Sequence, residues 1–191
     1  MQAGPSVPGV VTYSAMSIDE SALVLLVPEC EDLVGPWRRQ FDQAAIFGVP
    51  AHVTVLYPFV PPRLIDDALK VQLNSLFGTF SAFEFSLTQT RRFDDRVLYL
   101  APSPVEPFDQ LTRVVTELFP DYPPYEGRFE SVLAHLTVAD RASPDQLDVV
   151  DSALSAGLPI HASAHRVSLL VGSDEPATWH VMEEFALGGG S

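Results

Sequence analysis

The alternation of apolar and polar residues divides the chain into short strands and longer amphipathic helices. Strands are predicted where apolar residues run on or alternate over a short stretch, at residues 22–27, 51–59, 81–90, 96–100, 131–139, 165–171 and 179–187. Helices are predicted where apolar residues recur at helical spacing after a proline, from Pro36, Pro62, Pro107 and Pro144 onward. Residues 91–95 are predicted to form a polar turn between two strands. The mixture of helices with hairpin-like neighbouring strands predicts an α+β (α/β) fold with a largely antiparallel sheet.

The same order of elements occurs in both halves of the chain. Each half has an apolar strand, a helix, a strand that carries one histidine (His52 or His135), and a helix that begins at a proline. We interpret this order as a duplication within a single domain that spans residues 20–187. Residues 1–19 and 188–191 are predicted to be a flexible leading segment and a flexible tail, because they are rich in Gly, Pro or Ser.

Composition narrows the class of protein further. Hydrophobic residues make up 47% of the chain and charged residues 19%, which argues against intrinsic disorder. The formal charge of −14 argues against an extended nucleic-acid-binding surface, because an acidic surface repels a long polyanion. The single cysteine, Cys30, excludes a disulfide framework and a thiolate-rich zinc site. No apolar run is long enough to cross a membrane and no basic secretory signal begins the chain, so we expect a cytoplasmic protein without membrane partners.

A repeated motif carries the candidate chemistry. The pattern Ala-His-apolar-Thr-Val occurs at residues 51–55 and again at residues 134–138. Residues two apart on a strand point to the same face, so His52 projects with Thr54, and His135 projects with Thr137. If a pseudo-twofold axis relates the two halves, the two His–Thr pairs converge on one cleft.

Two such pairs suit the hydrolysis of a phosphodiester without a metal. One imidazole can take a proton from water while the other protonates the leaving oxygen, and threonine hydroxyls can donate to the phosphate oxygens. A lone histidine on an apolar strand is more often a structural residue, but two copies of one motif at equivalent places favour a functional interpretation. The residues leave open which histidine is the acid and which is the base.

The paired motif resembles that of the two-histidine (2H) phosphoesterases, in the branch of the bacterial 2′-5′ RNA ligases and cyclic phosphodiesterases. His52-Val53-Thr54-Val55 and His135-Leu136-Thr137-Val138 both match the family pattern, and the resemblance extends over about residues 20–187. It implies a bilobal duplicated fold with helices outside and a central cleft, and hydrolysis of a 2′,3′-cyclic phosphate or a related nucleotide or RNA-end phosphodiester. It implies no metal and no cofactor. Two alternatives stay open: 2′-5′ RNA ligation at the same site, or a catalytically idle nucleotide-binding module.

Some residues depart from the family pattern or add to it. Ligase-type members often have an arginine three positions after the second threonine, whereas this chain has Asp140 there, which would repel phosphate. Tyr57 occupies a position where the family often has phenylalanine, and it could stack on a base or pack in the core. Arg91 and Arg92 lie in the predicted turn, and Arg92 is a candidate for binding substrate phosphate, with a solvated turn as the alternative. The remaining histidines, His161, His165 and His180, lack a matching threonine and are predicted to be structural or exposed.

Overall fold

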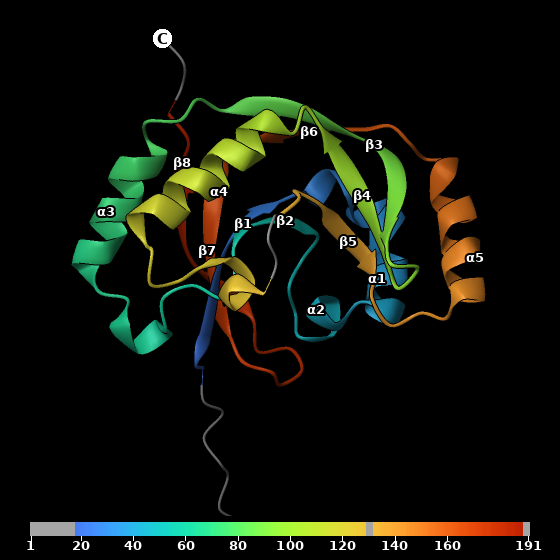
Figure 1. Ribbon diagram of the computed structural model, residues 1–191, viewed down its shortest axis with the longest axis horizontal. Coiled ribbons are helices and arrows are strands. Elements are labelled where there is room, and N and C mark those ends of the chain that lie inside the picture. The colour runs from blue at the N-terminus through green and yellow to red at the C-terminus, as the bar shows by residue number, and fades with distance from the viewer. Residues whose placement is uncertain (1–17, 129–131, 189–191) are drawn as a thin grey trace, which may run out of the picture.

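The computed structural model describes residues 18–128 and 132–188, which fold into two four-stranded sheets with helices packed against them (Figure 1). In order across the first sheet, the strands are β2 (His52–Leu56), β1 (Glu20–Leu26), β7 (Arg166–Gly172) and β8 (His180–Ala186). In order across the second sheet, they are β5 (Leu136–Ala139), β4 (Val97–Ser103), β3 (Phe83–Phe93) and β6 (Ile160–Ala164). All neighbouring strands are antiparallel, so the predicted α+β fold class is confirmed.

Four longer helices cover the sheets in pairs. Helices α3 (Asp67–Phe77) and α4 (Glu106–Leu118) contact the first sheet, while α1 (Glu31–Phe41) and α5 (Pro144–Ser155) contact the second. The helices form because each has an apolar stripe to bury: α4, for example, buries Phe108, Leu111 and Val115. The shorter elements are α2 (Gln43–Ile46) and three 3₁₀ turns, at Pro28–Cys30, Pro62–Leu64 and Pro124–Gly127.

The two halves of the chain exchange elements. Strands β7 and β8, from the end of the chain, complete the sheet that begins with β1 and β2. Strand β3, from the first half, pairs with β4 of the second half. Helices cross as well, since α1 contacts β5 and α4 contacts β2. The sheets therefore do not correspond to the two halves of the sequence, although each histidine motif belongs to a different sheet.

One continuous apolar core links both sheets and all four long helices. It includes alternate residues of the histidine strands, such as Val53 and Val55 on β2 and Val138 on β5. The residues between them, His52 and Thr54 among these, are only half-buried. The core thus fixes the register of both strands and holds the polar face of each away from it.

Two helices begin elsewhere than predicted. Helix α1 begins at Glu31 and continues through Pro36, because burial of the residues on either side, Val34 and Arg38 among them, outweighs the backbone hydrogen bond that proline removes. Pro62 begins only a 3₁₀ turn, and α3 starts after Asp66, whose side chain accepts from the Leu69 N–H at 2.8 Å. Helix α5 begins at Pro144, as predicted, and Ser143 caps it in a capping box with Gln146.

The strand boundaries also need correction. Strand β3 continues to Phe93, so residues 91 and 92 lie on a strand, and the turn is formed by residues 94–96. Strand β5 starts only at Leu136, and residue 131 of the predicted strand lies outside the described residues. Strand β6 was not predicted, because small alanines at 162 and 164 give its buried face a weak apolar signal.

The ends of the chain are described only in part. Most of the predicted leading segment and of the tail, residues 1–17 and 189–191, lies outside the described residues. Gly188, the first residue of the predicted tail, accepts a backbone hydrogen bond from Ala82 at 3.1 Å. In the described part of the chain, no helix is both long enough and apolar enough to span a membrane.

Candidate active site

The two motif histidines are held by the same local hydrogen bond. His52 Nδ1 lies 2.8 Å from the carbonyl oxygen of Pro50, and His135 Nδ1 lies 2.7 Å from that of Leu133. Because a carbonyl oxygen only accepts, Nδ1 carries the proton in both rings, and Nε2 is the basic nitrogen of each neutral imidazole. His180, the first residue of β8, makes the same bond to the carbonyl of Thr178, so this bond alone does not distinguish a functional histidine.

The strands bring the two motifs to one place. β2 and β5 are edge strands of their sheets and lie next to each other. His52 and His135 are within range of each other's charge, since a positive charge on His135 lowers the pKa of His52. Thr54 and Thr137 follow on the same faces of their strands, and both are half-buried.

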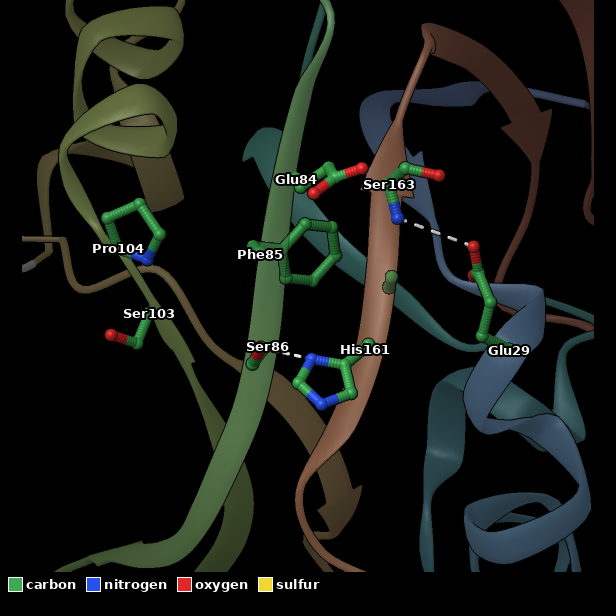
Figure 2. A pocket seen from close by; sticks show the side chains of 9 residues that line it. Glu29, Glu84, Phe85, Ser86, Ser103, Pro104, His161 and Ser163 are labelled. Atoms are coloured by element: carbon green, nitrogen blue, oxygen red, sulfur yellow. Dashed lines mark hydrogen bonds between the residues drawn. The ribbon is translucent and has the colours of Figure 1, made fainter.

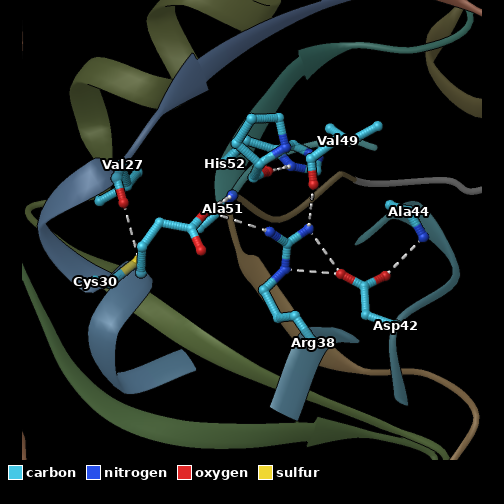
Figure 3. Close-up of polar contacts among 10 residues, drawn as sticks. Val27, Cys30, Arg38, Asp42, Ala44, Val49, Ala51 and His52 are labelled. Carbon is cyan, nitrogen blue, oxygen red and sulfur yellow. Dashed lines mark hydrogen bonds and ion pairs between the residues drawn. The ribbon is translucent and has the colours of Figure 1, made fainter. Parts of the chain in front are cut away.

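A buried ion pair lies behind His52, as Figure 3 shows. Arg38 of α1 is 2% exposed and donates to Asp42 through Nε and Nη2, both at 2.8 Å. The same guanidinium donates to the carbonyl of Val49 at 3.2 Å, and Glu31 accepts from the backbone N–H of Ala51. These bonds tie α1 to the segment that leads into His52. Arg38 is thus a positioning residue for that imidazole.

The surroundings lower the pKa of both histidines. Burial, followed by the positive charges of Arg38 and His135, lowers the pKa of His52 to about 4, despite the opposing bond to Pro50. Burial also lowers the pKa of His135, which the bond to Leu133 opposes. Both free imidazoles are therefore neutral near pH 7, and His52 alone has a nearby arginine that disfavours its protonation.

Aromatic rings fix the orientation of His135. The rings of Phe93 and Tyr99 meet its imidazole edge-to-face, with centroids 5.1 and 5.5 Å away. Phe93 and Tyr99 stack on each other at 4.2 Å. His135 therefore has an aromatic support where His52 has an ion-pair network.

A tyrosine from the connection between α4 and β5 reaches the first motif. The Tyr125 side chain hydrogen-bonds with Thr54, and its backbone N–H donates to the carbonyl of Tyr57 at 2.7 Å. Tyr125 and Glu126 both adopt positive φ angles, 50° and 57°, which is uncommon for residues other than glycine and is often found at functional sites. Tyr125 therefore brings a phenol to the face that carries His52 and Thr54.

A cavity of about 390 Å³ opens beside the first motif. It is lined by Glu20, Ala22, Val24, Gln43, Ala44, Phe47, Val49, His52, Thr54, Tyr57, Asp140, Leu170, Asp174 and Trp179. Tyr57, for which stacking or core packing had been considered, is half-buried and contributes to the cavity wall. Asp140, the departure from the family pattern, accepts from the Gln43 N–H at 3.2 Å at the rim.

Arg92 does not lie with the other predicted site residues. Arg91, Tyr99 and Thr137 are register partners across β3, β4 and β5 and therefore share one face of the sheet. Arg92 points to the other face, where it pairs with Asp148 and Asp151 of α5 at 2.7 and 3.4 Å. The prediction of Arg92 as a phosphate ligand rested on a turn that is in fact a strand, and Arg91 is the exposed arginine on the face of Thr137.

A second hollow of about 410 Å³ lies away from the motifs, between β3, β4, β6 and the 3₁₀ turn at Pro28–Cys30 (Figure 2). His161 lies in it and hydrogen-bonds with the Ser86 hydroxyl at 2.8 Å.

Cys30 is buried, and its burial raises the pKa of its thiol to about 12, so it is a packed thiol rather than a nucleophile. Among the described residues, no three His, Cys, Asp or Glu side chains gather as a metal site.

Comparison with known proteins identifies the family. The family model of the 2′-5′ RNA ligase superfamily matches residues 26–176. The chain belongs to the 2′-5′ RNA ligase superfamily. The resemblance on which the sequence interpretation rested is thereby confirmed. No curated protein sequence matches the chain.

Solved structures similar to this member of the 2′-5′ RNA ligase superfamily share its fold. Escherichia coli LigT in complex with 3′-AMP is 12% identical, with a TM-score of 0.57, and covers 90% of this chain and 99% of its own. TT0787 of Thermus thermophilus is 19% identical, with a TM-score of 0.59, and covers 90% and 100%. A structure described as a phosphoesterase is 14% identical, with a TM-score of 0.56, and covers 90% and 99%.

Sequence reasoning missed two residues of this site. Arg38 gave a detectable signal, since Arg38 and Asp42 stand four apart on a helix that precedes the His52 strand. Tyr125 gave only a weak one, because it lies in a proline-rich connection whose path no local pattern fixes. Both act through contacts between segments that are distant in the sequence.

Proposed function

We propose that this member of the superfamily is a metal-independent phosphodiesterase that hydrolyses the 2′,3′-cyclic phosphate of a nucleotide or RNA end. One observation carries the proposal: two His–Thr pairs from adjacent edge strands, each with Nδ1 held by a backbone carbonyl and Nε2 left as the basic nitrogen. This arrangement offers two proton-transfer groups and two hydroxyl donors around one phosphorus atom.

The proposed reaction is a hydrolytic displacement at phosphorus. Nε2 of one neutral imidazole takes a proton from water, whose oxygen forms a new bond to phosphorus. The bond from phosphorus to one ribose oxygen breaks, and the second imidazole, as imidazolium, gives that oxygen its proton. Thr54 and Thr137 donate to the non-bridging oxygens, where negative charge increases in the transition state. The product is a nucleotide monoester.

We assign His52 as the general base and His135 as the general acid. The buried Arg38 cation disfavours protonation of His52, which suits the group that must start neutral. His135 has aromatic neighbours in place of a cation, so the negative charge of a bound phosphate can raise its pKa and protonate it.

Asp140 supports hydrolysis of a small substrate over ligation of RNA ends. Its carboxylate stands at the cavity rim beside His52, where a second phosphate of an RNA chain would be repelled. Crystal structures of Escherichia coli LigT with 3′-AMP and with ATP support a nucleotide-sized substrate in this fold.

The test is an assay of 2′,3′-cyclic nucleotides in the presence of a chelator, with three histidine variants. His52→Ala and His135→Ala should each lower kcat by about 10²–10⁴-fold, because each removes a proton-transfer group. His180→Ala is the matched control, since His180 makes the same Nδ1 bond without a threonine two positions later, and it should keep full activity.

A parallel gel assay with cyclic-phosphate-ended and 5′-hydroxyl RNA would detect joined ends. The proposal is wrong if wild-type protein hydrolyses no cyclic phosphate, if chelator abolishes turnover, or if folded His52→Ala and His135→Ala keep wild-type rates. Circular dichroism of each variant separates loss of chemistry from loss of fold.

A further inference from the structure

The cavity beside His52 has an apolar floor. Ala22, Val24 and Leu170 come from adjacent strands of the first sheet and form a small buried cluster with Val49. The cavity's volume of about 390 Å³ falls within the range of small-molecule sites. It is continuous with the proposed catalytic centre, because His52 and Thr54 line it.

The aromatic wall of this cavity is fixed before any ligand enters. Trp179 Nε1 donates to the Ser173 carbonyl at 2.8 Å, and its ring lies so close to Gly172 that a Cβ there would collide with it. Tyr57 meets the Trp179 ring at 61°, with centroids 6.1 Å apart, and its hydroxyl donates to Glu20 at 2.6 Å. A planar ring would therefore pack against an aromatic wall that needs no rearrangement.

The polar rim of the cavity carries negative charge. Glu20, Asp140 and Asp174 line it, and no lysine or arginine is among its described lining residues. An ionised carboxylate only accepts hydrogen bonds. The rim thus favours a ligand edge that carries N–H donors, and it disfavours carbonyl oxygens and phosphate.

Building on the proposed function, we propose that this cavity is the nucleobase subsite and that its carboxylate rim selects a base with an exocyclic amino group. Adenine, cytosine and guanine present N–H₂ donors, whereas uracil has two carbonyl oxygens and a single ring N–H. The phosphate would lie at His52 and Thr54, and the base would lie on the apolar floor against Trp179. Phosphate as the occupant of this part of the cavity is disfavoured by the three carboxylates, and the apolar floor suits the face of a ring.

The first experiment measures binding separately from turnover. The His52→Ala/His135→Ala variant is titrated by calorimetry with 3′-AMP, 3′-CMP, 3′-GMP and 3′-UMP. The amino-bearing nucleotides should bind at least about 10-fold more tightly than 3′-UMP, because a site with fixed polar partners rejects a ring that cannot pair with them. Equal binding, or tighter binding of 3′-UMP, would overturn the inference.

The second experiment changes the rim. In the same inactive background, Asp140→Asn/Asp174→Asn keeps an acceptor oxygen for the Gln43 N–H and gives each side chain a donor for uracil carbonyls. The preference for 3′-AMP over 3′-UMP should fall at least about threefold, a part of the roughly 10-fold discrimination expected of such a pair. Asp145→Asn on α5, also an exposed aspartate, is the control and should leave the ratio unchanged. An unchanged ratio in the double variant would also overturn the inference.

The two proposals fail in different ways. If the wild type hydrolyses no cyclic nucleotide but amino-bearing nucleotides still bind selectively, the proposed function is wrong and the subsite stands. If all four cyclic nucleotides are hydrolysed and bound equally well, the function stands and the subsite assignment is wrong.

Discussion

His52 and His135 share a tautomer but not an environment. A bound Nδ1 leaves Nε2 as the basic nitrogen of each ring, and both bonds run to the backbone carbonyl two residues earlier. The difference comes from their neighbours: an arginine behind one ring and two aromatic rings around the other. The proposed division of labour between the two imidazoles therefore depends on residues outside the motif.

This difference predicts the pH dependence of catalysis. The proposed mechanism needs neutral His52 and protonated His135, whose pKa values are about 4 and below the usual 6.5 in the free protein. The rate constant kcat/KM should fall as the pH drops through the pKa of His52, and fall again as it rises through that of His135. We expect a bell-shaped profile with its maximum on the acidic side of pH 6.5. Initial rates in overlapping buffers would measure it, and a maximum well above pH 7 would contradict the assignment.

The two threonines should matter through their hydroxyl groups. Thr54→Val and Thr137→Val keep the branched shape of the side chain but remove the donor to phosphate, so each should lower kcat by about 10²–10³-fold. Thr54→Ser and Thr137→Ser keep the donor and serve as controls that should retain most of the rate. Steady-state kinetics on a cyclic nucleotide would measure the effect. Valine variants as active as the serine variants would exclude phosphate binding by the hydroxyls.

The sequence predicts single residues well where a strand period decides the face. His52 with Thr54 and His135 with Thr137 could be placed together because residues two apart share a side. The prediction for Arg92 differs from the structure because residues 91–95 are predicted as a turn. Arg92 in fact lies on β3, where the alternation of side chains directs it toward α5. The spacing of Arg38 and Asp42 indicates a pair, but no local pattern encodes the contacts that Arg38 and Tyr125 make with distant segments.

At the scale of elements, Arg38 joins α1 to the segment before β2 through its bond to the Val49 carbonyl, and its ion pair with Asp42 holds the guanidinium in place. Arg38→Ala would leave Asp42 charged and unpaired in the interior, so it should lower the free energy of unfolding by about 3–5 kcal/mol. Arg39→Ala, one position along and exposed, should change it by less than about 0.5 kcal/mol. Urea denaturation would compare the two. A loss in Arg38→Ala no larger than in Arg39→Ala would mean that the pair does not stabilise this junction.

Helices and strands were predictable where their buried faces carry large apolar residues and their exposed faces carry polar ones. Helix α4 has a strong apolar stripe and was predicted almost to its first residue. Strand β6 was missed because its buried face is mainly alanine. The sequence places the start of helix α1 too late, because proline usually marks the first turn of a helix. Here Pro36 lies inside the helix, which the burial of its neighbours stabilises.

At the scale of the whole molecule, the exchange of strands between the halves could not be predicted from the sequence. The repeated order of elements indicates a duplication, but it does not say which sheet the last strand of each repeat joins. Pairing of β7 with β1, and of β3 with β4, depends on long-range contacts that no local pattern encodes. The fold thus has two sheets in which strands from both halves of the sequence are interleaved.

This interleaving predicts the behaviour of a cut chain. The β3–β4 turn is exposed at Asp94 and Asp95, so a protease site placed there could be cleaved in the folded protein. Because both sheets contain strands from each fragment, the two pieces should stay associated and keep cyclic-phosphate activity. Size-exclusion chromatography of cleaved and uncleaved protein would test this. Separate elution of the fragments under native conditions would contradict it.

Strand exchange also has a consequence for how such a protein could originate. A polypeptide that contained only one repeat would lack the strand that its sheet receives from the other, and it would carry one imidazole where the reaction needs two. Two copies that exchanged strands, as β3 and the β7–β8 pair are exchanged here, would supply both. A strand-swapped homodimer joined by a covalent tether would have this arrangement, in which each sheet combines strands of both halves. In a joined chain the two halves are free to differ, and here Arg38 stands near one imidazole whereas two aromatic rings contact the other.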